Sequence, residues 1–214
     1  MALFGLFDKK FCSVCGEKIG LLGNTKLKDG NLCKDCAAKL SPWFRSASAS
    51  TLDQIYDQML YRDSNKKALE EFNTSLSLGY STKVLVDEAA WKFVCTSAGS
   101  LIAANPDILD LGDITAVKID TDEYKNELKR KNKEGKEESY IPPRFEYRYS
   151  FYIIINVNNP YFQEMKFKIA PDVTIQGGPR INLDLESEYV QSITEANSVA
   201  DTLWNLREER RAML

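Results

Sequence analysis

Residues 12–36 read CSVCGEKIGLLGNTKLKDGNLCKDC, and their four cysteines determine how the start of the chain folds. They form two Cys-x-x-Cys pairs, which residues 16–32 separate. Each pair brings two sulfur atoms to one ion, and two such pairs supply the four thiolates of a closed tetrahedral zinc site. The spacing therefore predicts one structural Zn²⁺ bound by Cys12, Cys15, Cys33 and Cys36.

The residues around the cysteines suit a treble-clef or ribbon-type zinc module. Gly16 permits a positive φ directly after Cys15. Asp29-Gly30 suits a two-residue hairpin turn between short strands at 25–28 and 31–33. The second cysteine pair then lies at the start of a short helix over 34–40, where the positive end of the helix dipole favours thiolates.

The cysteines have two further interpretations besides structural zinc. Four protein ligands leave no open coordination position, so we expect no catalytic role for the metal. A redox dithiol is the remaining alternative, although two matched pairs explain more than a single disulfide would. The fifth cysteine, Cys95, lies in the strand-like stretch WKFVC, where we expect a buried, inert thiol.

The residue types needed for common catalytic mechanisms are largely missing. The chain has no histidine, which excludes Ser-His-Asp and Cys-His mechanisms and His-ligated catalytic metals. It also lacks the glycine-rich patterns of nucleotide-binding loops. The candidate carboxylates lie around expected turns, where Asp commonly caps the backbone. They are Asp107, Asp110, Asp113, Asp120, Asp122 and Glu123. We therefore expect a protein that is not an enzyme.

Charge and hydropathy limit the classes of partner and the cellular compartment that we expect for this protein. The 214 residues carry a net charge of -3, but residues 1–45 hold eight Lys or Arg against four Asp or Glu. Four thiolates with one Zn²⁺ would lower that local excess by about 2, so the electrostatic case for nucleic acid is weak. No apolar run approaches the roughly 18 residues of a membrane span, and MALFGLF lacks the features of a secretory signal. We expect a cytoplasmic protein with reduced thiols.

Turn-forming residues and changes in composition along the chain predict three regions: a zinc ribbon over 1–42, a linker and amphipathic helix over 43–80, and a β domain over 81–214. The linker reads SPWFRSASAS, with Trp43 and Phe44 expected to be exposed. The helix spans 51–72, with Ser50 or Thr51 as N-cap. Its apolar stripe, expected to face a core, is Leu52, Ile55, Tyr56, Met59 and Leu60.

Strand-like patterns fill much of the third region. KVLVDEAAWKFVC predicts two strands joined near residues 87–90, and ITAVKID at 114–120 predicts a third. RFEYRYSFYIIINV at 144–157 alternates most sharply, with Phe145, Tyr147, Tyr149 and Phe151 on one face. MKFKIA at 165–170 and VTIQG at 173–177 predict further strands, while the charged stretch 124–139 predicts a solvated hairpin tip or loop.

The C-terminal stretch 185–213 returns to helical spacing. Its apolar stripe is Tyr189, Ile193, Ala196, Val199, Ala200, Leu203 and Trp204. Antiparallel strands closed by such a helix predict an α+β domain.

The stretch CSVCGEKIGLLGNTKLKDGNLCKDCAAKLSP resembles an uncharacterised bacterial family, domain of unknown function 4428, in its cysteines, its IGLL segment and its KLKDG turn. That resemblance implies zinc at the four cysteines and supplies no activity. Residues 82–176 resemble pleckstrin-homology-like or GRAM-like β domains in strand order, with the helix at 186–211 as the capping helix. Members that bind phosphoinositides usually carry a basic first hairpin loop, whereas this chain reads VDEAAW, which favours protein binding.

Three functions follow as hypotheses. The first is a non-enzymatic interaction or adaptor protein that contacts a protein partner through the aromatic strand and Trp43 and Phe44. The second is nucleic-acid binding by the ribbon. Its lysines would be Lys18, Lys26, Lys28, Lys34 and Lys39. The third is peripheral membrane association through MALFGLF and the loop at 125–136. The oligomeric state is left open.

Overall fold

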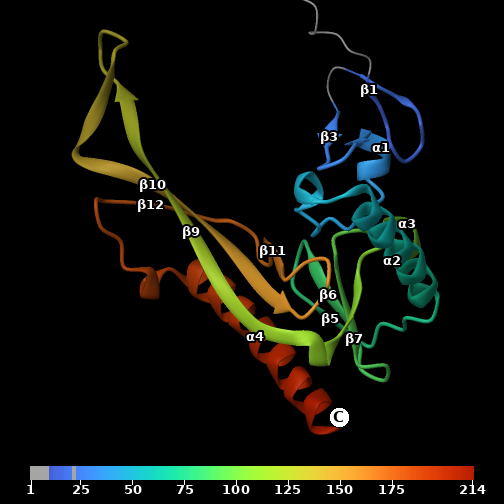
Figure 1. The fold of residues 1–214 in the computed structure, drawn as a ribbon. Coiled ribbons are helices and arrows are strands. Elements are labelled where there is room, and N and C mark those ends of the chain that lie inside the picture. The colour runs from blue at the N-terminus through green and yellow to red at the C-terminus, as the bar shows by residue number, and fades with distance from the viewer. Residues whose placement is uncertain (1–9, 21–22) are drawn as a thin grey trace, which may run out of the picture. The chain divides into compact units, whose positions relative to one another are not determined.

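A computed structural model describes residues 10–20 and 23–214 and divides the chain into two compact units (Figure 1). Unit 1 consists of Met1–Phe72, Ala98–Ile108 and Asn159–Gln163. Unit 2 consists of Asn73–Ser97, Leu109–Asn158 and Glu164–Leu214. Each unit is therefore built from segments that are separated in the sequence.

Unit 1 begins with two very short hairpins, followed by helices. Strand β1 pairs with β2, and β3 pairs with β4, both antiparallel. Its elements are β1 (Lys10–Phe11), β2 (Lys18–Ile19), β3 (Thr25–Lys26), β4 (Asn31–Leu32), α1 (Lys34–Ala37), η1 (Ala47–Ala49), α2 (Leu52–Glu70) and α3 (Leu101–Ala104).

Helix α2 confirms the predicted helix and its N-cap. The Thr51 hydroxyl accepts from the backbone N–H of Gln54, and the Gln54 side chain accepts from the N–H of Thr51, which makes a capping box. The predicted stripe is correct for Ile55, which is fully buried. It is wrong for Tyr56 and Leu60, which are 41% and 65% exposed, because polar residues occupy much of the buried face instead.

Unit 2 contains a four-stranded sheet in the order β5-β6-β7-β8, and its first three strands pair antiparallel. Its strands are β5 (Leu76–Leu78), β6 (Lys83–Asp87), β7 (Lys92–Thr96) and β8 (Ile108–Asp110), the last of which begins at the boundary with unit 1. The two strands predicted from KVLVDEAAWKFVC are β6 and β7. Their inward residues, including Val84, Val86 and Phe93, are completely buried.

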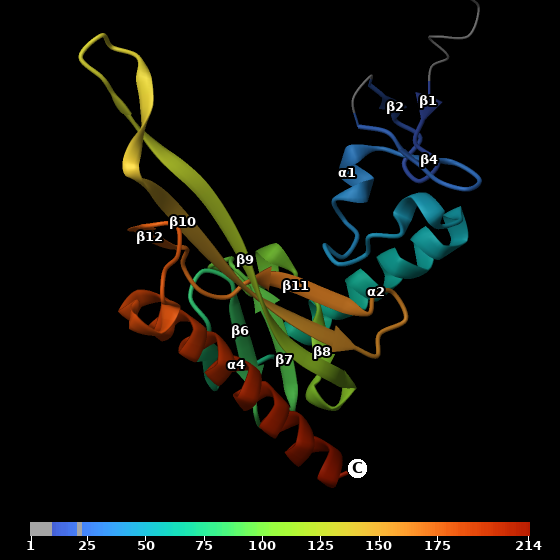
Figure 2. The ribbon, with the colours of Figure 1, turned by 90° about the vertical axis from the view of Figure 1, so that its left-hand side faces the viewer.

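The second sheet is organised around one long strand, β10 (Glu137–Val157). One edge of β10 pairs with β9 (Ile114–Lys131), as Figure 2 shows. The other edge of β10 pairs with β11 (Glu164–Lys168) at residues 152–156 and with β12 (Val173–Gly177) at residues 145–149. The predicted aromatic face is confirmed, since Tyr147, Tyr149 and Phe151 are buried.

The stretch 124–139, predicted as a solvated hairpin tip or loop, is the end of a hairpin whose strands extend further than expected. Strand β9 continues to Lys131 and β10 begins at Glu137, so only 132–136 connect them. The two strands form the long arm in Figures 1 and 2. Backbone pairing of the two strands and cross-strand pairs such as Arg130–Glu138, at 2.9 Å, stabilise the arm in place of apolar residues. Residues 140–143 lie between paired Ser139 and Arg144 as a bulge.

Helix α4 (Ser187–Ala212) packs along the sheet of β9 and β10, after the short η3 (Leu183–Leu185). Ala196, Val199 and Leu203 are buried, as predicted. Trp204 is not part of this buried face, because it is 37% exposed and lies against Arg207. The whole chain is thus α+β, with a cysteine-rich start and antiparallel sheets closed by a C-terminal helix.

Candidate metal centre

The four predicted ligands come from two turns of the chain. Cys12 follows β1, and Cys15 closes a turn in which the N–H of Gly16 donates to the carbonyl of Cys12 at 2.9 Å. Gly16 has a φ of 75°, as the sequence predicted, so the chain can reverse there without strain. Cys33 caps α1, and Cys36 lies within that helix.

The structure brings all four sulfur atoms together. The Sγ atoms of Cys12, Cys15, Cys33 and Cys36 lie within 4.8 Å of one another. The Sγ atoms of Cys15 and Cys33 are 3.7 Å apart. A tetrahedral zinc ion with bonds of about 2.3 Å to sulfur requires sulfur–sulfur separations of about 3.8 Å. The donor set and its spacing therefore fit one structural Zn²⁺.

Backbone N–H groups point at the sulfur atoms. The N–H of Cys33 donates to Sγ of Cys12 at 3.3 Å, and the N–H of Cys36 donates to Sγ of Cys33 at 3.4 Å. Burial raises the pKa of the Cys12 thiol, but N–H groups, including those of Cys15 and Cys33, outweigh it and lower the pKa to about 6. Backbone N–H groups thus favour the thiolate form of this ligand.

The raised pKa of the Cys36 thiol illustrates why four close sulfur atoms favour the binding of a cation. Burial and the neighbouring sulfur atoms of the other three cysteines raise the pKa of the Cys36 thiol. Four thiolates so close together repel one another, and a divalent cation removes that repulsion while it displaces the remaining protons. All four positions of the ion would then be filled by protein, which is the closed arrangement of a structural site.

The two turns are also held together directly. The N–H of Ser13 donates to the carbonyl of Asn31 at 2.8 Å, and the N–H of Asn31 donates to Oγ of Ser13 at 3.1 Å. A Cβ added to Gly30 would lie 2.5 Å from Oγ of Ser13. Glycine at this position allows the turns to approach closely.

The hairpin between β3 and β4 differs from the prediction. Its connection is four residues long, 27–30, and the N–H of Leu27 donates to the carbonyl of Gly30 at 2.9 Å. Gly30 does not have a positive φ, so Asp29-Gly30 is not the expected two-residue turn. Packing against Ser13, rather than turn geometry, explains this glycine.

A small apolar core surrounds the cysteines. Buried Ile19, Leu27, Leu32, Leu40 and Ile55 form one cluster with Cys12 and Cys36. Phe44 and Met59 pack against it from later in the chain. The cluster joins α2 to the zinc module, so the module's core extends beyond the cysteine-rich residues.

The linker residues expected to be exposed are half-buried. Trp43 and Phe44 are both intermediate in exposure, and the Phe44 ring packs edge-on against Tyr161 at 6.4 Å between centroids. The expectation of an exposed linker is wrong here, because residues 159–163 return to unit 1 and cover Phe44.

Cys95 lies on β7 and is 6% exposed, as expected for a buried thiol.

The structure does not bring the candidate carboxylates together. Asp107 is buried in unit 1. Asp110 caps the 3-10 turn η2 (Leu111–Asp113), and Asp113 is its last residue. Asp120, Asp122 and Glu123 lie along β9. Within residues 10–20 and 23–214, the four cysteines are the only cluster of three or more Cys, Asp or Glu arranged to hold a metal.

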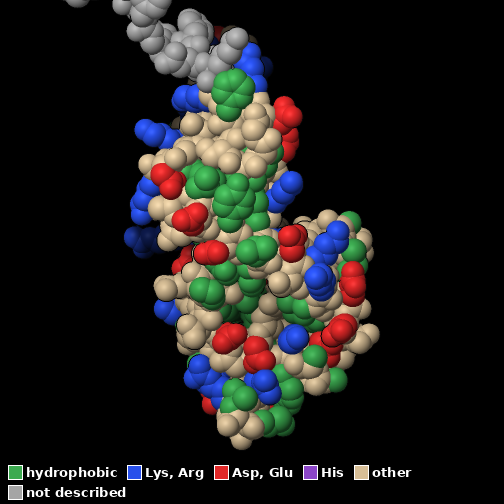
Figure 3. Space-filling view, turned by 45° about the vertical axis from the view of Figure 1, so that its right-hand side comes forward, with side chains coloured by type: hydrophobic (Ala, Val, Ile, Leu, Met, Phe, Trp, Pro, Cys, Tyr) green, Lys and Arg blue, Asp and Glu red, His purple; other side chains and the backbone are tan. Residues whose placement is uncertain are grey.

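The predicted nucleic-acid lysines are exposed, and none forms an ion pair with a described residue. Charges of both signs lie on the face in Figure 3.

The predicted membrane segment MALFGLF lies outside the described residues. In the described part of the chain, no helix is long and apolar enough to cross a membrane.

A buried polar network in unit 1 was not predicted from the sequence. Arg62 of α2 donates to Oδ1 of Asp107 at 2.8 Å, and Ser41 donates to Oδ2 at 2.7 Å. The guanidinium also donates to the carbonyl of Asn105. Burial raises the pKa of Asp107, and the attraction of Arg62 offsets this only in part. The signal in the sequence was polar residues at 58, 62 and 65, on the helical face that also carries Ile55.

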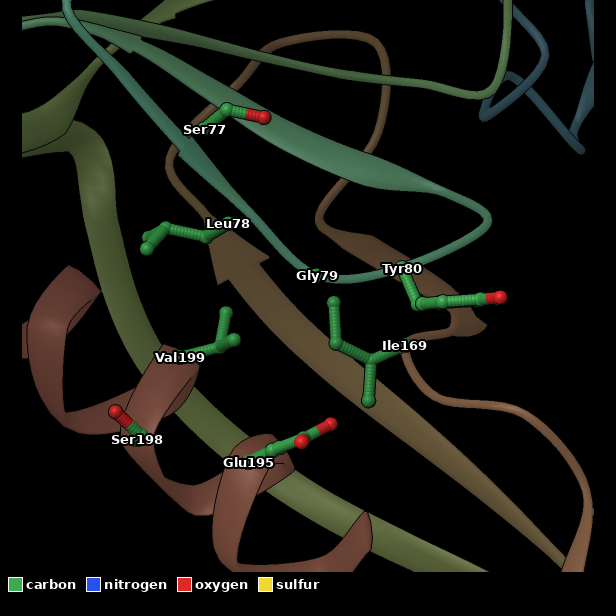
Figure 4. Close-up of a pocket in the computed structure, with 8 residues that line it drawn as sticks. All are labelled: Ser77, Leu78, Gly79, Tyr80, Ile169, Glu195, Ser198 and Val199. Carbon is green, nitrogen blue, oxygen red and sulfur yellow. The ribbon is translucent and has the colours of Figure 1, made fainter.

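Unit 2 contains a cavity of about 290 Å³ between the β5 turn and α4 (Figure 4). Leu78, Ile169 and Val199 provide its apolar walls, and Glu195 is the carboxylate that lines it. That carboxylate already accepts from Gln191 at 2.9 Å. No base or nucleophile among the lining residues is paired with Glu195.

Comparison with known proteins agrees with the metal centre. Residues 10–58 match the model of a protein family described as "Domain of unknown function (DUF4428)". The match covers the cysteine module and the first part of α2, and it confirms the resemblance of the ribbon. No curated protein and no solved structure matches the chain. The likeness of unit 2 to pleckstrin-homology-like domains therefore stays a prediction.

Proposed function

We propose that this chain is a non-enzymatic, zinc-stabilised interaction protein, an adaptor that binds another protein through the outer face of α2 beside the zinc module. The observation that carries the proposal is the orientation of α2. Its polar residues Gln58, Arg62 and Asn65 are buried, whereas Tyr56 and Leu60 are exposed. The buried face of α2 is thus partly polar, although it also holds Ile55 and Leu69, while two large apolar side chains lie outside on the helix.

Tyr56 and Leu60 stand four residues apart and therefore share one face of the helix. The Tyr56 hydroxyl donates to the carbonyl of Ser13 at 3.5 Å, which ties this face to the first cysteine turn. Phe11, just before Cys12, is 54% exposed. Amphipathic helical faces with anchors at this spacing are a common mode of protein recognition.

The metal centre supports a scaffolding role. A closed set of four thiolates stabilises the module and leaves no coordination position for substrate. The absence of histidine and a unit 2 cavity whose carboxylate, Glu195, is hydrogen-bonded to Gln191 support a role without catalysis. Zinc here would hold α1 and the two hairpins in place next to the first turns of α2.

Nucleic-acid binding has less support. The exposed lysines of the ribbon are accompanied by Glu17, Asp29 and Asp35, and the metal-bound thiolates would reduce their field further. A protein that relied on phosphate contacts would show a stronger basic excess.

The test is quantitative affinity purification of the tagged full chain from its own cells. Wild type is compared with Tyr56→Ser/Leu60→Ser, with Cys33→Ser/Cys36→Ser and with Leu185→Ser, whose side chain is 79% exposed in unit 2. We expect one set of proteins to be lost with the first two variants and kept with the third. Circular dichroism and zinc content verify that the α2 variant is folded. Partners kept by that variant, or no partner at native abundance, would contradict the proposal.

A further inference from the structure

The second unit carries a long sheet edge without a partner. Strand β9 spans 18 residues, and its inner edge pairs with β10 from Ile114 to Lys131. In the described part of the chain, no strand pairs with its other edge. The backbone groups of that edge are a template for an additional strand, which proteins normally block or cover.

The side chains along this edge have an ordered pattern of charge. From Asp122 to Arg130 they read DEYKNELKR, with acids first, a lysine and a glutamate around the centre, and bases last. Residues 122–126 and 129–131 are exposed, and Glu127 and Leu128 are half-buried. Asp122, Glu127 and Lys129 form no ion pair with any described residue. When this sequence of charges is read in the reverse direction, it is complementary to itself: acids stand where the forward sequence has bases.

We propose that β9 pairs antiparallel with β9 of a second copy of this chain, about a two-fold axis at Asn126. This register places Asp122 opposite Arg130 of the other copy, Glu123 opposite Lys129, and Lys125 opposite Glu127. The two-fold axis repeats each pair, so all three oppositions occur twice. Tyr124, which is 57% exposed, comes opposite Leu128.

The charges select this register over its neighbours. Because a side chain must stay on its own face of the sheet, the register can shift only so that the axis moves by a whole residue. An axis at Lys125 places that lysine opposite itself and Glu123 opposite Glu127. An axis at Glu127 places that glutamate opposite itself and Lys125 opposite Lys129. Like charges directly opposite one another destabilise a strand pair.

The arm is suited to receive a second copy. Strand β10 supports β9 along its whole length, and rings from β10 hold its cations, with Lys125 at 4.4 Å from the Phe145 centroid and Arg130 at 5.7 Å from that of Tyr140. The edge is thus preformed, and pairing would extend the sheet across the axis. The inference uses only unit 2 and is independent of the role proposed for α2.

The test is analytical ultracentrifugation of the zinc-loaded full chain at low and at high salt. We expect a dimer that weakens as salt rises, because exposed ion pairs are screened. Two variants reverse the two ends of the edge: Lys129→Glu/Arg130→Glu and Asp122→Lys/Glu123→Lys. Each turns four opposite pairs into like pairs and should weaken the dimer by about tenfold or more.

A charge-swap rescue separates pairing from misfolding. Mixed together, the two variants regain every opposite pair, so an equimolar mixture should form the heterodimer. A chain with all four reversals should form homodimers again. Asn126→Cys should give an interchain disulfide on oxidation, because only residue 126 lies opposite itself. Lys118→Cys is the control that should not. A wild-type monomer at all concentrations, or a dimer unaffected by the reversals, overturns the proposal.

Discussion

Nη1 of Arg62 lies 2.8 Å from Oδ1 of Asp107, and the two side chains are 8% and 0% exposed. This ion pair joins α2 to the 98–108 segment inside unit 1. Removing one partner of a buried pair leaves an uncompensated charge, which costs more than the pair itself contributes.

We therefore expect Asp107→Asn to destabilise unit 1 by about 3–5 kcal/mol. Arg62→Met/Asp107→Leu should recover much of that loss, because neither charge is then left buried. Denaturant unfolding measures both variants. The control is Glu134→Gln in the exposed pair with Lys136, where we expect a change below about 1 kcal/mol. Equal stability of Asp107→Asn and wild type would show that the pair is not a structural requirement.

Gly30 and Gly20 provide a matched pair within the zinc module. Gly30→Ala should lower zinc affinity, because its new Cβ would meet Ser13 Oγ at 2.5 Å and separate the two cysteine turns. Gly20→Ala should have little effect, since nothing lies within 4 Å of the added atom and φ is not positive. Competition with a zinc-binding dye measures both affinities. Similar affinities for the two variants would refute the role given to Gly30.

Removal of the metal should unfold the module and leave unit 2 intact. Apparent zinc-binding energies of about 10–16 kcal/mol are also folding energies in small modules of this kind. With a strong chelator, we expect residues 10–40 to lose protection from amide exchange while β10 keeps it. Cys36→Ser should lose the bound zinc, and Cys95→Ser should keep one equivalent. A module that stays protected in chelator would be stabilised by its apolar core alone.

Leu203 and Trp204 are neighbours on α4 with opposite environments. Leu203 is fully buried, so Leu203→Ala should cost about 2–5 kcal/mol through lost burial and the cavity left behind. Trp204→Ala should cost much less, although Trp204 is the larger side chain, because it is 37% exposed. Thermal and denaturant unfolding measure the two costs. The reverse order would mean that α4 is rotated about its axis.

Asp172 should make stability depend on pH. Hydrogen bonds from Lys168 at 2.7 Å and from Ser150 at 2.5 Å lower the pKa of this carboxyl group below its ordinary value of 3.8. Its contribution is therefore present above pH 3.8 and is lost as the pH falls through the lowered pKa. Asp172→Asn should be less stable than wild type at neutral pH, and the difference should shrink in acid. A constant difference across acid titration would contradict this assignment.

Local patterns predicted the elements whose formation depends on neighbouring residues. The aromatic alternation of 144–157 lies in β10, and the helical spacing at 51–72 and 185–213 gave α2 and α4. At 124–139 the absence of apolar residues predicted a hairpin tip or loop; the hairpin is present, but its strands leave only 132–136 as the connection. A charged strand can persist when a partner strand satisfies its backbone, and the partner here is the neighbouring strand β10.

The sequence by itself predicted the metal centre, because each Cys-x-x-Cys pair, with a glycine after Cys15, is a local feature that brings two sulfur atoms to one ion. Only the tertiary structure decided what surrounds them. It buried Arg62 against Asp107, 45 positions away, turned Tyr56 and Leu60 outward, covered Phe44 with Tyr161, and left one edge of β9 unpaired among the described strands. These outcomes depend on which distant segments meet, and composition and periodicity do not contain that information.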